Sequence, residues 1–352
     1  MIKNFNLSTL NTFKVSAVAA LFTEINTIED IDAVVEYVGA GAPFFMLGSG
    51  ANVLFVEDYQ GLVIKNNLKG IKVLSEDNET IKLAVGSGED WTELVAFAVG
   101  KNWSGIENLA FIPGTVGAAV VQNIAAYGQN FEDIFIEAES INLLDGEIVR
   151  FSKENCQFNY RTSIFKGKQH QHFFITSVTI VLSKISQSNI SYHSRYESLE
   201  AELVNKKPPY SVSDIYEAVV SLRKKKLPDW QIVGTAGSFF KNPVISKKHF
   251  LALQTKVSEL QSYPVERLDY SKDAISTEVE YVKVPAGRLL DELGWKGKRI
   301  GNVGTFEKQA LVVINLGGAS GAEILDFTQQ MAADVLNNYE IVLEPEVYIL
   351  KN

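Results

Sequence analysis

The segment over residues 237–243, Gly-Ser-Phe-Phe-Lys-Asn-Pro, places groups that can do chemistry beside groups that exclude water. Ser238, Lys241 and Asn242 contribute a hydroxyl, an ammonium and an amide around a pair of phenylalanines. A core segment would bury those polar groups at a cost of several kcal/mol each if they lacked partners, and a surface loop would gain nothing from the rings. The mixture therefore predicts a water-poor pocket that holds a polar ligand and can donate a proton to it, with an ordinary loop as the alternative.

Two glycine-rich segments could bind a flat, anionic ligand. Residues 48–54, Gly-Ser-Gly-Ala-Asn-Val-Leu, follow an apolar run, and their glycines can adopt positive φ so that successive N–H groups converge on a phosphate. The segment is neither a Walker loop nor a dinucleotide fingerprint, and a tight structural turn is an equal alternative. Residues 112–128 are rich in small side chains that let backbone approach a ligand closely, and Gln122, Asn123 and Tyr127 add polar groups. For this second segment we prefer ligand contact to a pure packing role.

Three charged residues elsewhere are candidates for acid–base or anion-binding work. Arg161 lies among aromatic residues, so its guanidinium could be partly desolvated and still grip a carboxylate with two hydrogen bonds. A surface arginine is the alternative. Glu344 and Glu346 lie in an expected strand over residues 341–350, where alternation would put both on one face and let each perturb the ionisation of the other. An exposed pair on an edge strand is the alternative there.

The composition excludes several classes of protein. The chain has 352 residues, of which 46 % are hydrophobic, so it can form two or three subdomains with ordinary cores. A net charge of −9 argues against nucleic-acid binding, and an anionic ligand would need cations concentrated locally. The Arg-Lys-Lys-Lys run at 223–226 is one such cluster, but a solvated helix end is the alternative, and from the run alone we slightly favour that alternative. The four histidines have no metal-ligand spacing beyond one His-x-His, so we expect no metal.

The same features bound the cellular context. The single cysteine, Cys156, excludes an intramolecular disulfide and suits a reducing compartment. The first residues lack the apolar run of a secretion signal, and the most apolar window, over residues 111–128, is interrupted by proline, polar and glycine residues. We therefore expect a cytoplasmic protein with no membrane insertion.

Apolar periodicity predicts short strands alternating with helices, which indicates an α+β or α/β architecture. Helices are expected over residues 28–38, 91–99 and 320–338, the last opened by a Ser-x-x-Glu capping box, and strands over 44–47, 62–64, 81–85, 137–144, 173–182 and 341–350. Serine, lysine and proline become frequent between residues 183 and 209, so we place a linker there and the start of a new domain near residue 212.

Taken together, these segments resemble the flavoenzyme family of UDP-N-acetylenolpyruvoylglucosamine reductase, and the resemblance covers nearly the whole chain. The matching strings occur in the family's order, at residues 47–54, 107–109, 112–128, 160–166, 226–229, 236–243, 286–291, 308–311 and 343–347. Any one string would be weak, whereas several in order are specific. An insert over residues 189–199 resembles the substrate-covering tyrosine loop of the family's longer subgroup.

The resemblance implies an α+β fold with an FAD-binding region of the vanillyl-alcohol-oxidase type over residues 1–211, in two subdomains at about 1–66 and 67–211. An α+β substrate-binding domain over 212–352 would follow. It also implies noncovalent FAD, NADPH as reductant, and reduction of UDP-N-acetylenolpyruvoylglucosamine to UDP-N-acetylmuramate in peptidoglycan precursor synthesis. We expect a monomer.

Residue roles follow from the same resemblance. Arg161 would clamp the substrate carboxylate, Ser238 would protonate C2, and Glu346 would act in protonated form or orient Arg161 or a water. The residues expected to bind the UDP-sugar are Tyr192, Lys226, Asn242 and Glu292. Those expected to bind FAD are Gly48, Ser49, Gly50, Ala51, Asn52, Val53, Leu54, Ile112, Pro113, Gly114, Thr115, Gly117, Ala118, Gln122, Asn123, Ala126 and Tyr127.

Four positions depart from the family pattern. Ala51 replaces a usual serine, which removes one hydroxyl contact to the diphosphate, and Thr162 replaces a usual aspartate that could orient Arg161. Ala125 and Arg288 replace a usual glycine and a common tryptophan. Two rival functions therefore stay open: an oxidase of the same flavin fold, and a binding protein that has lost turnover. The first is disfavoured because no His or Cys lies in the glycine-rich segments to tether a flavin.

Overall fold

The computed structural model describes residues 1–186, 190, 193–194, 197–265 and 280–352. Their contacts divide the chain into two compact units. The first unit comprises Met1–Phe5, Ala19–Gly50 and Gln60–Lys225, and the second comprises Asn6–Val18, Ala51–Tyr59 and Lys226–Asn352. The domain boundary placed near residue 212 from composition stays a prediction, although the helix that begins there clusters almost wholly with the first unit. None of the helices described here is long and apolar enough to span a membrane.

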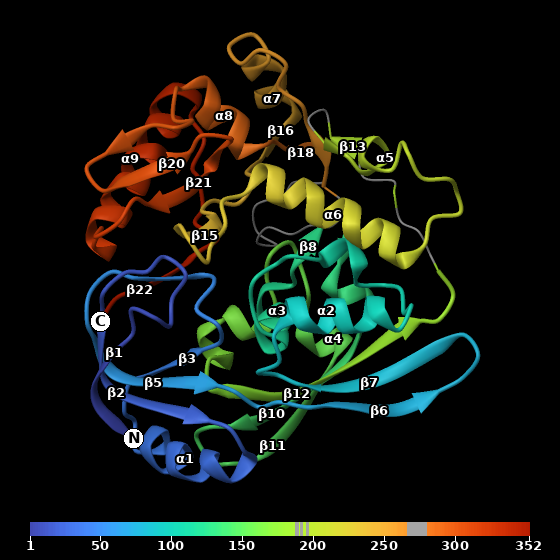
Figure 1. Cartoon of the computed structure of the whole chain (residues 1–352). Coiled ribbons are helices and arrows are strands. Elements are labelled where there is room, and N and C mark those ends of the chain that lie inside the picture. The colour runs from blue at the N-terminus through green and yellow to red at the C-terminus, as the bar shows by residue number, and fades with distance from the viewer. Residues whose placement is uncertain (187–189, 191–192, 195–196, 266–279) are drawn as a thin grey trace. The chain divides into compact units, whose positions relative to one another are not determined.

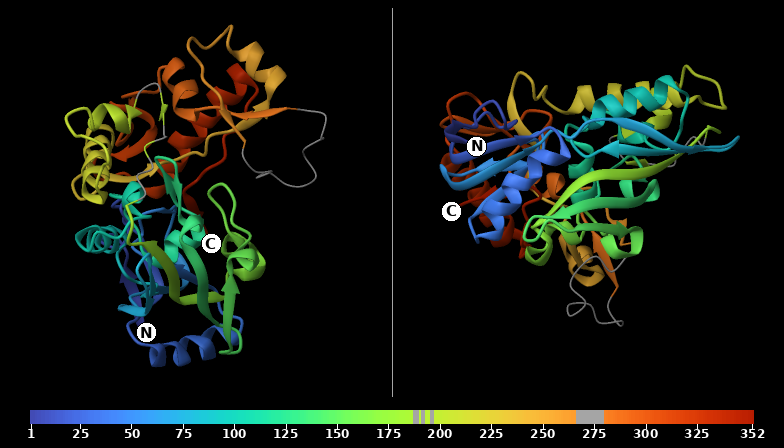
Figure 2. Two further views of the ribbon diagram at one scale, coloured as in Figure 1. Left: turned by 90° about the vertical axis from the view of Figure 1, so that its right-hand side faces the viewer. Right: turned by 90° about the horizontal axis from the view of Figure 1, so that it is seen from below.

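The first unit contains a four-stranded sheet with one helix on its face. Its strands, in sheet order, are β1 (Ile2–Asn6), β2 (Val18–Ile25), β5 (Tyr59–Asn66) and β3 (Phe44–Leu47). A short turn of helix, η1 (Ile28–Ile31), leads into α1 (Asp32–Gly39), whose Val34 and Val38 pack with Leu62 and Ile64 of β5. Figure 2 shows α1 lying along this sheet. The expected helix over 28–38 and strand over 44–47 are confirmed.

The larger part of the first unit is a five-stranded antiparallel sheet, which provides most of its core. Its strands, in sheet order, are β11 (Ile148–Ser152), β10 (Phe135–Asn142), β12 (Phe173–Ser183), β7 (Thr80–Gly86) and β6 (Ile71–Glu76). The helices that contribute to its hydrophobic cluster include α2 (Trp91–Gly100), α3 (Val116–Gln122) and α6 (Val212–Lys226). Figure 1 shows α2, α3 and α6 on the same side of this sheet. Asp90 begins α2 by accepting from the amides of the first turn, at 2.8 and 3.1 Å.

The second unit is built on a four-stranded sheet covered on one face by helices. Its strands, in sheet order, are β15 (Gly234–Ser238), β21 (Gln309–Asn315), β20 (Val303–Phe306) and β19 (Arg299–Ile300). Helices α8 (Ala286–Glu292) and α9 (Gly321–Tyr339) pack against it, burying Leu289 and Phe327 with Val313. A three-stranded sheet and one helix complete the unit: β16 (Val244–Ser246), β18 (Tyr281–Lys283), β17 (Tyr263–Pro264) and α7 (Lys247–Leu253).

The remaining elements are short. They are β4 (Val53–Phe55), β8 (Ala125–Ala126), β9 (Gln129–Asn130), β13 (His193–Ser194), β14 (Glu197–Ser198), β22 (Tyr348–Leu350), α4 (Lys153–Cys156), α5 (Leu199–Glu202), η2 (Glu107–Leu109), η3 (Phe131–Asp133), η4 (Ile164–Lys166) and η5 (Lys168–His170). The capping box expected at α9 is confirmed: the Glu323 amide donates to Ser320 Oγ at 3.2 Å and the Ser320 amide donates to Glu323 Oε2 at 2.8 Å.

The strand expected over residues 341–350 is wrong in its first part. Only β22 is a strand, and it pairs in parallel with β4. Before it, Pro345 forms an isolated bridge with Phe240, and the chain bends at Glu346 and Val347. Strand alternation therefore does not apply to Glu344 and Glu346. Glu344 is exposed and ion-paired to Lys241 at 2.8 Å, whereas Glu346 is half-buried.

Candidate active site

Ser238 ends β15, at a bulge that interrupts its pairing with β21. The register shifts between Thr235 and Ser238, and Gly237 adopts a φ of +75° that a residue with a Cβ rarely takes. Thr235 stabilises the bulge, because its hydroxyl donates to the carbonyl of Val313 at 2.8 Å and accepts from the Gly237 amide at 3.1 Å. Bulges of this kind redirect a side chain. Here the redirected side chain is the hydroxyl of Ser238, which is half-buried.

The two rings that follow Ser238 belong to the core of the second unit. Phe239 and Phe240 are 0 % and 2 % exposed, with their ring centroids 5.1 Å apart, and Phe239 also contacts the ring of Phe13 at 6.4 Å. Lys241 and the side chains of its polar neighbours stay half-buried. The rings thus anchor the segment, and the polar groups are held at the surface of that core rather than inside it.

Glu346 lies next to the Ser238 segment in the second unit. Its backbone amide donates to the carbonyl of Phe239 at 2.8 Å, and the Lys241 amide donates to the carbonyl of Glu344 at 2.9 Å. Asn52 holds the carbonyl end of the same residue, because its Nδ2 donates to the Glu346 carbonyl at 3.1 Å. Two residues predicted to be catalytic, Ser238 and Glu346, are therefore held in one place within this unit although they are far apart in the sequence.

Helix α8 connects two of the residues expected to bind substrate. Asn242 Oδ1 accepts from the Ala286 amide at 3.0 Å, at the start of α8, which leaves the amide Nδ2 of Asn242 as the group available for a ligand. Glu292, the last residue of α8, is ion-paired with Arg288 at 2.6 Å. Arg288 also donates to the carbonyl and hydroxyl of Ser258, at 2.9 and 2.8 Å. Arg288, a departure from the family pattern, thus positions the carboxylate of Glu292.

The other two expected substrate residues give less information. Lys226 is half-buried at the end of α6, where the chain leaves the first unit. Three cations precede it: Arg223 donates to the Phe111 carbonyl at 2.9 Å, Lys224 lies 5.6 Å from the centre of the Phe111 ring, and Lys225 is paired with Glu202 at 2.6 Å. Much of the basic run is therefore structural. Tyr192 lies outside the described residues.

Arg161 belongs to the first unit, where a tight turn holds its backbone. Asn159 and Thr162 exchange two backbone hydrogen bonds of 3.0 and 3.2 Å around it, and Arg161 adopts a left-handed φ of +57°. This conformation costs a residue with a Cβ about 1–2 kcal/mol, and such strain concentrates at functional sites. The guanidinium lies 5.8 Å from the centre of the Tyr160 ring, and Lys166 Nζ donates to the Arg161 carbonyl at 2.8 Å. The Tyr160 ring and the turn therefore position Arg161, although Thr162 stands where the family usually has an aspartate that could do so.

The first residues of one glycine-rich segment, 48–50, meet the other segment in the first unit. A Cβ on Gly48 would lie 2.8 Å from Thr115 Oγ1, so only glycine allows the segments this approach. The centre of the second segment is α3, which the sequence did not predict. Small side chains are needed there because a Cβ on Gly117 would lie 3.0 Å from Ser87 Cβ. Asn123 ends α3 and is buried, with Nδ2 donating to the Asn159 carbonyl at 3.1 Å and Oδ1 accepting from the Glu132 amide at 3.1 Å.

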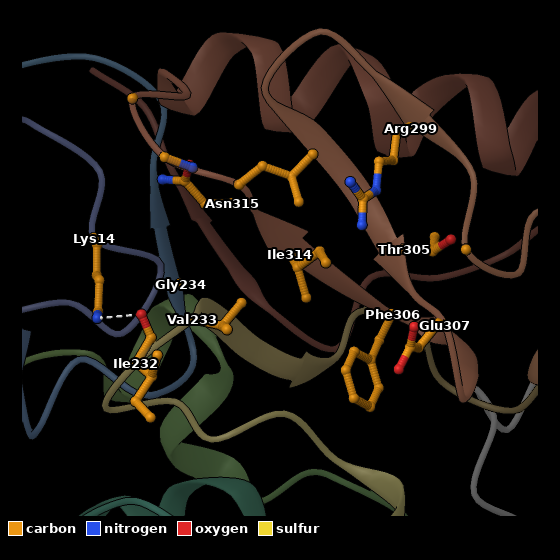
Figure 3. Close-up of a pocket in the computed structure, with 14 residues that line it drawn as sticks. Lys14, Ile232, Val233, Gly234, Arg299, Thr305, Phe306, Glu307, Ile314 and Asn315 are labelled. Carbon is orange, nitrogen blue, oxygen red and sulfur yellow. Dashed lines mark hydrogen bonds between the residues drawn. The ribbon is translucent and has the colours of Figure 1, made fainter.

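A separate cavity of about 620 Å³ lies in the second unit, over the sheet face opposite α8 and α9. Figure 3 shows Arg299, Ile314 and Glu307 around it, with Lys14 at its other side. Lys14 Nζ donates to the carbonyls of Gln231 and Ile232 at 2.7 and 2.8 Å. The lining includes none of the residues predicted to bind substrate or cofactor. Lys14 instead fixes the chain that enters β15.

Comparison with known proteins decides the family. A family model described as an FAD binding domain matches residues 19–152, and one described as the C-terminal domain of UDP-N-acetylenolpyruvoylglucosamine reductase matches residues 228–350. The protein of that name from Bacteroides fragilis is 33 % identical over 347 residues, covering 99 % of both chains. That from Paraburkholderia phytofirmans is 39 % identical over 348 residues, covering 98 % of this chain and 96 % of the relative. The chain belongs to the UDP-N-acetylenolpyruvoylglucosamine reductase family.

A solved structure shows that the fold also agrees. The UDP-N-acetylenolpyruvylglucosamine reductase of Thermus caldophilus superposes with a TM-score of 0.68 at 21 % identity, covering all of this chain and 99 % of that one. The family models and the relatives confirm the expected family, oxidoreductase class and FAD cofactor, and this structure confirms the expected α+β fold. The first unit suits the cofactor, because the Gly48 backbone lies so close to the Thr115 side chain that a Cβ at residue 48 would be 2.8 Å from Thr115 Oγ1.

One cation near this contact was missed by the sequence reasoning. Lys65 is the penultimate residue of β5, and its Nζ donates to the Gly48 carbonyl at 3.5 Å. Burial lowers the pKa of Lys65 below its ordinary value, an effect that Glu24 opposes and Lys69 reinforces. The only sequence signal is a lysine at the end of the apolar run Leu62-Val63-Ile64, which is common at strand ends.

Within the described residues, no group of three or more His, Cys, Asp or Glu side chains could hold a metal ion.

Proposed function

We propose that this chain reduces the enolpyruvyl ether of UDP-N-acetylenolpyruvoylglucosamine to UDP-N-acetylmuramate in peptidoglycan precursor synthesis, with NADPH as the reductant. The observation that carries the proposal is the backbone bond from Glu346 to Phe239, which joins the two second-unit segments bearing the expected acid–base groups. Bound FAD, which residues 48–54 and 112–127 would hold, would supply the two-electron chemistry that links NADPH to the terminal methylene of the substrate. The residues of this chain would supply charge stabilisation, a proton and binding.

Arg161 would hold the substrate carboxylate. Addition of a hydride at the terminal methylene pushes negative charge through C2 into that carboxylate, and a guanidinium fixed in advance stabilises the charge as it develops. The support is the turn and the Tyr160 ring that hold Arg161, because a positioned cation needs no reorganisation when the reaction occurs.

Ser238 would donate its hydroxyl proton to C2, which completes the lactyl ether, and would regain a proton from solvent. Serine is a weak acid, but the electron-rich C2 is a strong base, and positioning compensates for the remaining difference. Glu346 would orient the arginine or a water, or act in protonated form. The bulge at Gly237 and the bonds on both sides of Glu346 support these roles.

The UDP-sugar would be held by Lys226, Asn242 and Glu292, together with Tyr192. The Nδ2 of Asn242 is oriented by its capping bond to α8, and the carboxylate of Glu292 by Arg288. Residues 48–54 and 112–127 would hold the FAD without a covalent bond. We further propose that the protein acts as a monomer in the cytoplasm; the single, buried Cys156 supports the reducing compartment.

NADPH oxidation with and without the enolpyruvyl sugar nucleotide tests this function. We expect the purified protein to be yellow, to lose its flavin to the supernatant on acid precipitation, and to oxidise NADPH continuously only when the sugar nucleotide is present. A colourless protein that takes up no added FAD would contradict the proposal, and so would turnover that is independent of the sugar nucleotide. Flavin that stays with the acid pellet would indicate covalent attachment instead.

A further inference from the structure

Lys65 lies at the edge of the four-stranded sheet where the first glycine-rich segment begins. β3 and β5 are parallel and in register, so that Leu47, the last residue of β3, is opposite Lys65. Parallel strands end at the same sheet edge, and residues that follow one strand are within reach of side chains at the end of its neighbour. The observed contact agrees, since Lys65 Nζ donates to the carbonyl of Gly48 at 3.5 Å.

The end of β5 is held firmly, which limits where this lysine can go. The next residue, Asn66, donates through Nδ2 to Ser87 Oγ at 2.7 Å and to the Ile175 carbonyl at 3.0 Å. Its Oδ1 accepts from the Leu68 amide at 3.1 Å. Because adjacent side chains on a strand point to opposite faces, these bonds direct Lys65 away from Ser87.

The ammonium of Lys65 is half-buried without a close counter-ion. Its bond to Gly48 is a long one to a neutral acceptor, and no carboxylate of the described residues lies within ion-pair distance of its ammonium. A desolvated cation gains more from an anion than an exposed one does, because the surrounding medium screens the attraction less. Lys69, four residues on, differs in both respects: it is exposed and lies 3.5 Å from Glu89.

We propose that Lys65 is a binding residue for the diphosphate of FAD. The inference rests on the assignment of residues 48–54 to the cofactor. The lysine would supply the positive charge that the glycine-rich loop lacks in a chain of net charge −9. It would also replace the hydroxyl contact that Ala51 does not provide at the position where the family usually has serine.

Binding to the flavin-free protein tests this role without relying on activity. The probes are FAD and riboflavin, which share the ring system, whereas riboflavin lacks both the diphosphate and the adenosine. Affinities are measured by quenching of flavin fluorescence. We expect Lys65→Met to weaken FAD binding about 10- to 100-fold, the range for a charge-assisted hydrogen bond, and to leave riboflavin binding unchanged. Lys65→Arg should retain most of the FAD affinity. Lys69→Met is the matched control and should bind both flavins like the parent protein.

Two results would overturn the inference. One is an unchanged FAD affinity in Lys65→Met, and the other is an equal loss for FAD and riboflavin, which would assign the lysine a packing role. Far-UV circular dichroism and thermal unfolding of each variant show whether it is folded, and Lys65→Gln serves if Lys65→Met is not. A parent protein that binds no FAD would instead contradict the proposed function, so that the two failures are distinguishable.

Discussion

Ser238 is positioned by a backbone irregularity, so its hydroxyl can be removed with little effect on packing. We expect Ser238→Ala to lower turnover about 10²- to 10⁴-fold, the usual contribution of a placed proton donor. Flavin absorbance should still be lost on addition of NADPH, since that half-reaction needs no proton from serine. It should then fail to return on addition of the sugar nucleotide. Stopped-flow absorbance separates the two half-reactions.

A second half-buried serine in the same unit provides the control for this variant. Ser246 caps α7 by accepting from the His249 amide at 3.2 Å. Ser246→Ala should cost about 1 kcal/mol of stability, as loss of a cap does, and leave both half-reactions unchanged. Rapid return of the flavin absorbance in Ser238→Ala would remove Ser238 from the proton-donor role.

Cys156 illustrates how burial decides the behaviour of a single residue. Desolvation raises the pKa of this thiol to about 12, with a smaller contribution from the charge of Glu154. The folded protein therefore keeps the thiol protonated at pH 8, and we expect no reaction with a disulfide reagent until the chain unfolds. The raised pKa also means that stability falls as pH rises from about 9, where the unfolded thiol ionises, towards 12. Full labelling of the native protein within minutes would contradict the burial.

At the scale of elements, the segments with strong local patterns are those that the sequence predicted. The helices α2 and α9 bury one face over several turns, and the strands β7 and β12 bury apolar residues along their length. The apolar pattern that predicts each element therefore lies within its own sequence. α3 was missed because small residues carry no periodic signal. The strand over 341–350 was predicted too long because the chain changes partner at Pro345, from the Phe240 segment to β4. Such a change depends on contacts that no local window contains.

The parallel pair of β4 and β22 has a functional consequence. Asn52 bonds to both sides of the bend at Glu346, since its Nδ2 donates to the Glu346 carbonyl at 3.1 Å and its carbonyl accepts from the Tyr348 amide at 3.0 Å. Because Asn52 is also an expected FAD-binding residue, the measurement uses saturating FAD. We expect Asn52→Ala to slow the sugar-nucleotide half-reaction about tenfold, the equivalent of one hydrogen bond, and to slow reduction by NADPH less. The two rates measured separately show this split.

Thr12→Val is the matched control, because the Thr12 hydroxyl donates to the carbonyl of Ala51, the neighbour of Asn52, at 3.4 Å. If the control slowed the same half-reaction as Asn52→Ala, the effect would belong to the segment as a whole. Equal slowing of both half-reactions in Asn52→Ala would likewise contradict a specific role in positioning Glu346.

At the scale of the molecule, the chain interleaves its two units in a way that composition could not reveal. The sequence located the residues expected at the site through their family pattern, because those strings are continuous. It could not show that Asn6–Val18 and Ala51–Tyr59 belong to the same unit as the C-terminal residues. For the same reason the contact of Lys65 with Gly48 was not predicted, since it depends on the register between two strands.

This interleaving predicts that residues 226–352 do not fold alone, even though a family model matches 228–350 as a domain. Phe13 and Leu54, each 0 % exposed, complete the core of the second unit. β22 has β4 as its partner, and Asn315 donates to the carbonyl of Phe13 at 2.9 Å. Loss of one buried phenylalanine typically costs about 3–5 kcal/mol, and that of a leucine about 2–5, which together approach the whole stability of a domain.

We therefore expect the fragment over residues 226–352 to lack a cooperative thermal transition and near-UV circular dichroism bands, both of which the full chain should show. A variant of the full chain, Phe13→Ala, tests the same contact without truncation and should lower the midpoint of unfolding by several degrees. A sharp transition in the isolated fragment, with near-UV bands like those of the full chain, would mean that the N-terminal segments only cover a unit that is already stable. In that case the compact units would not be folding units.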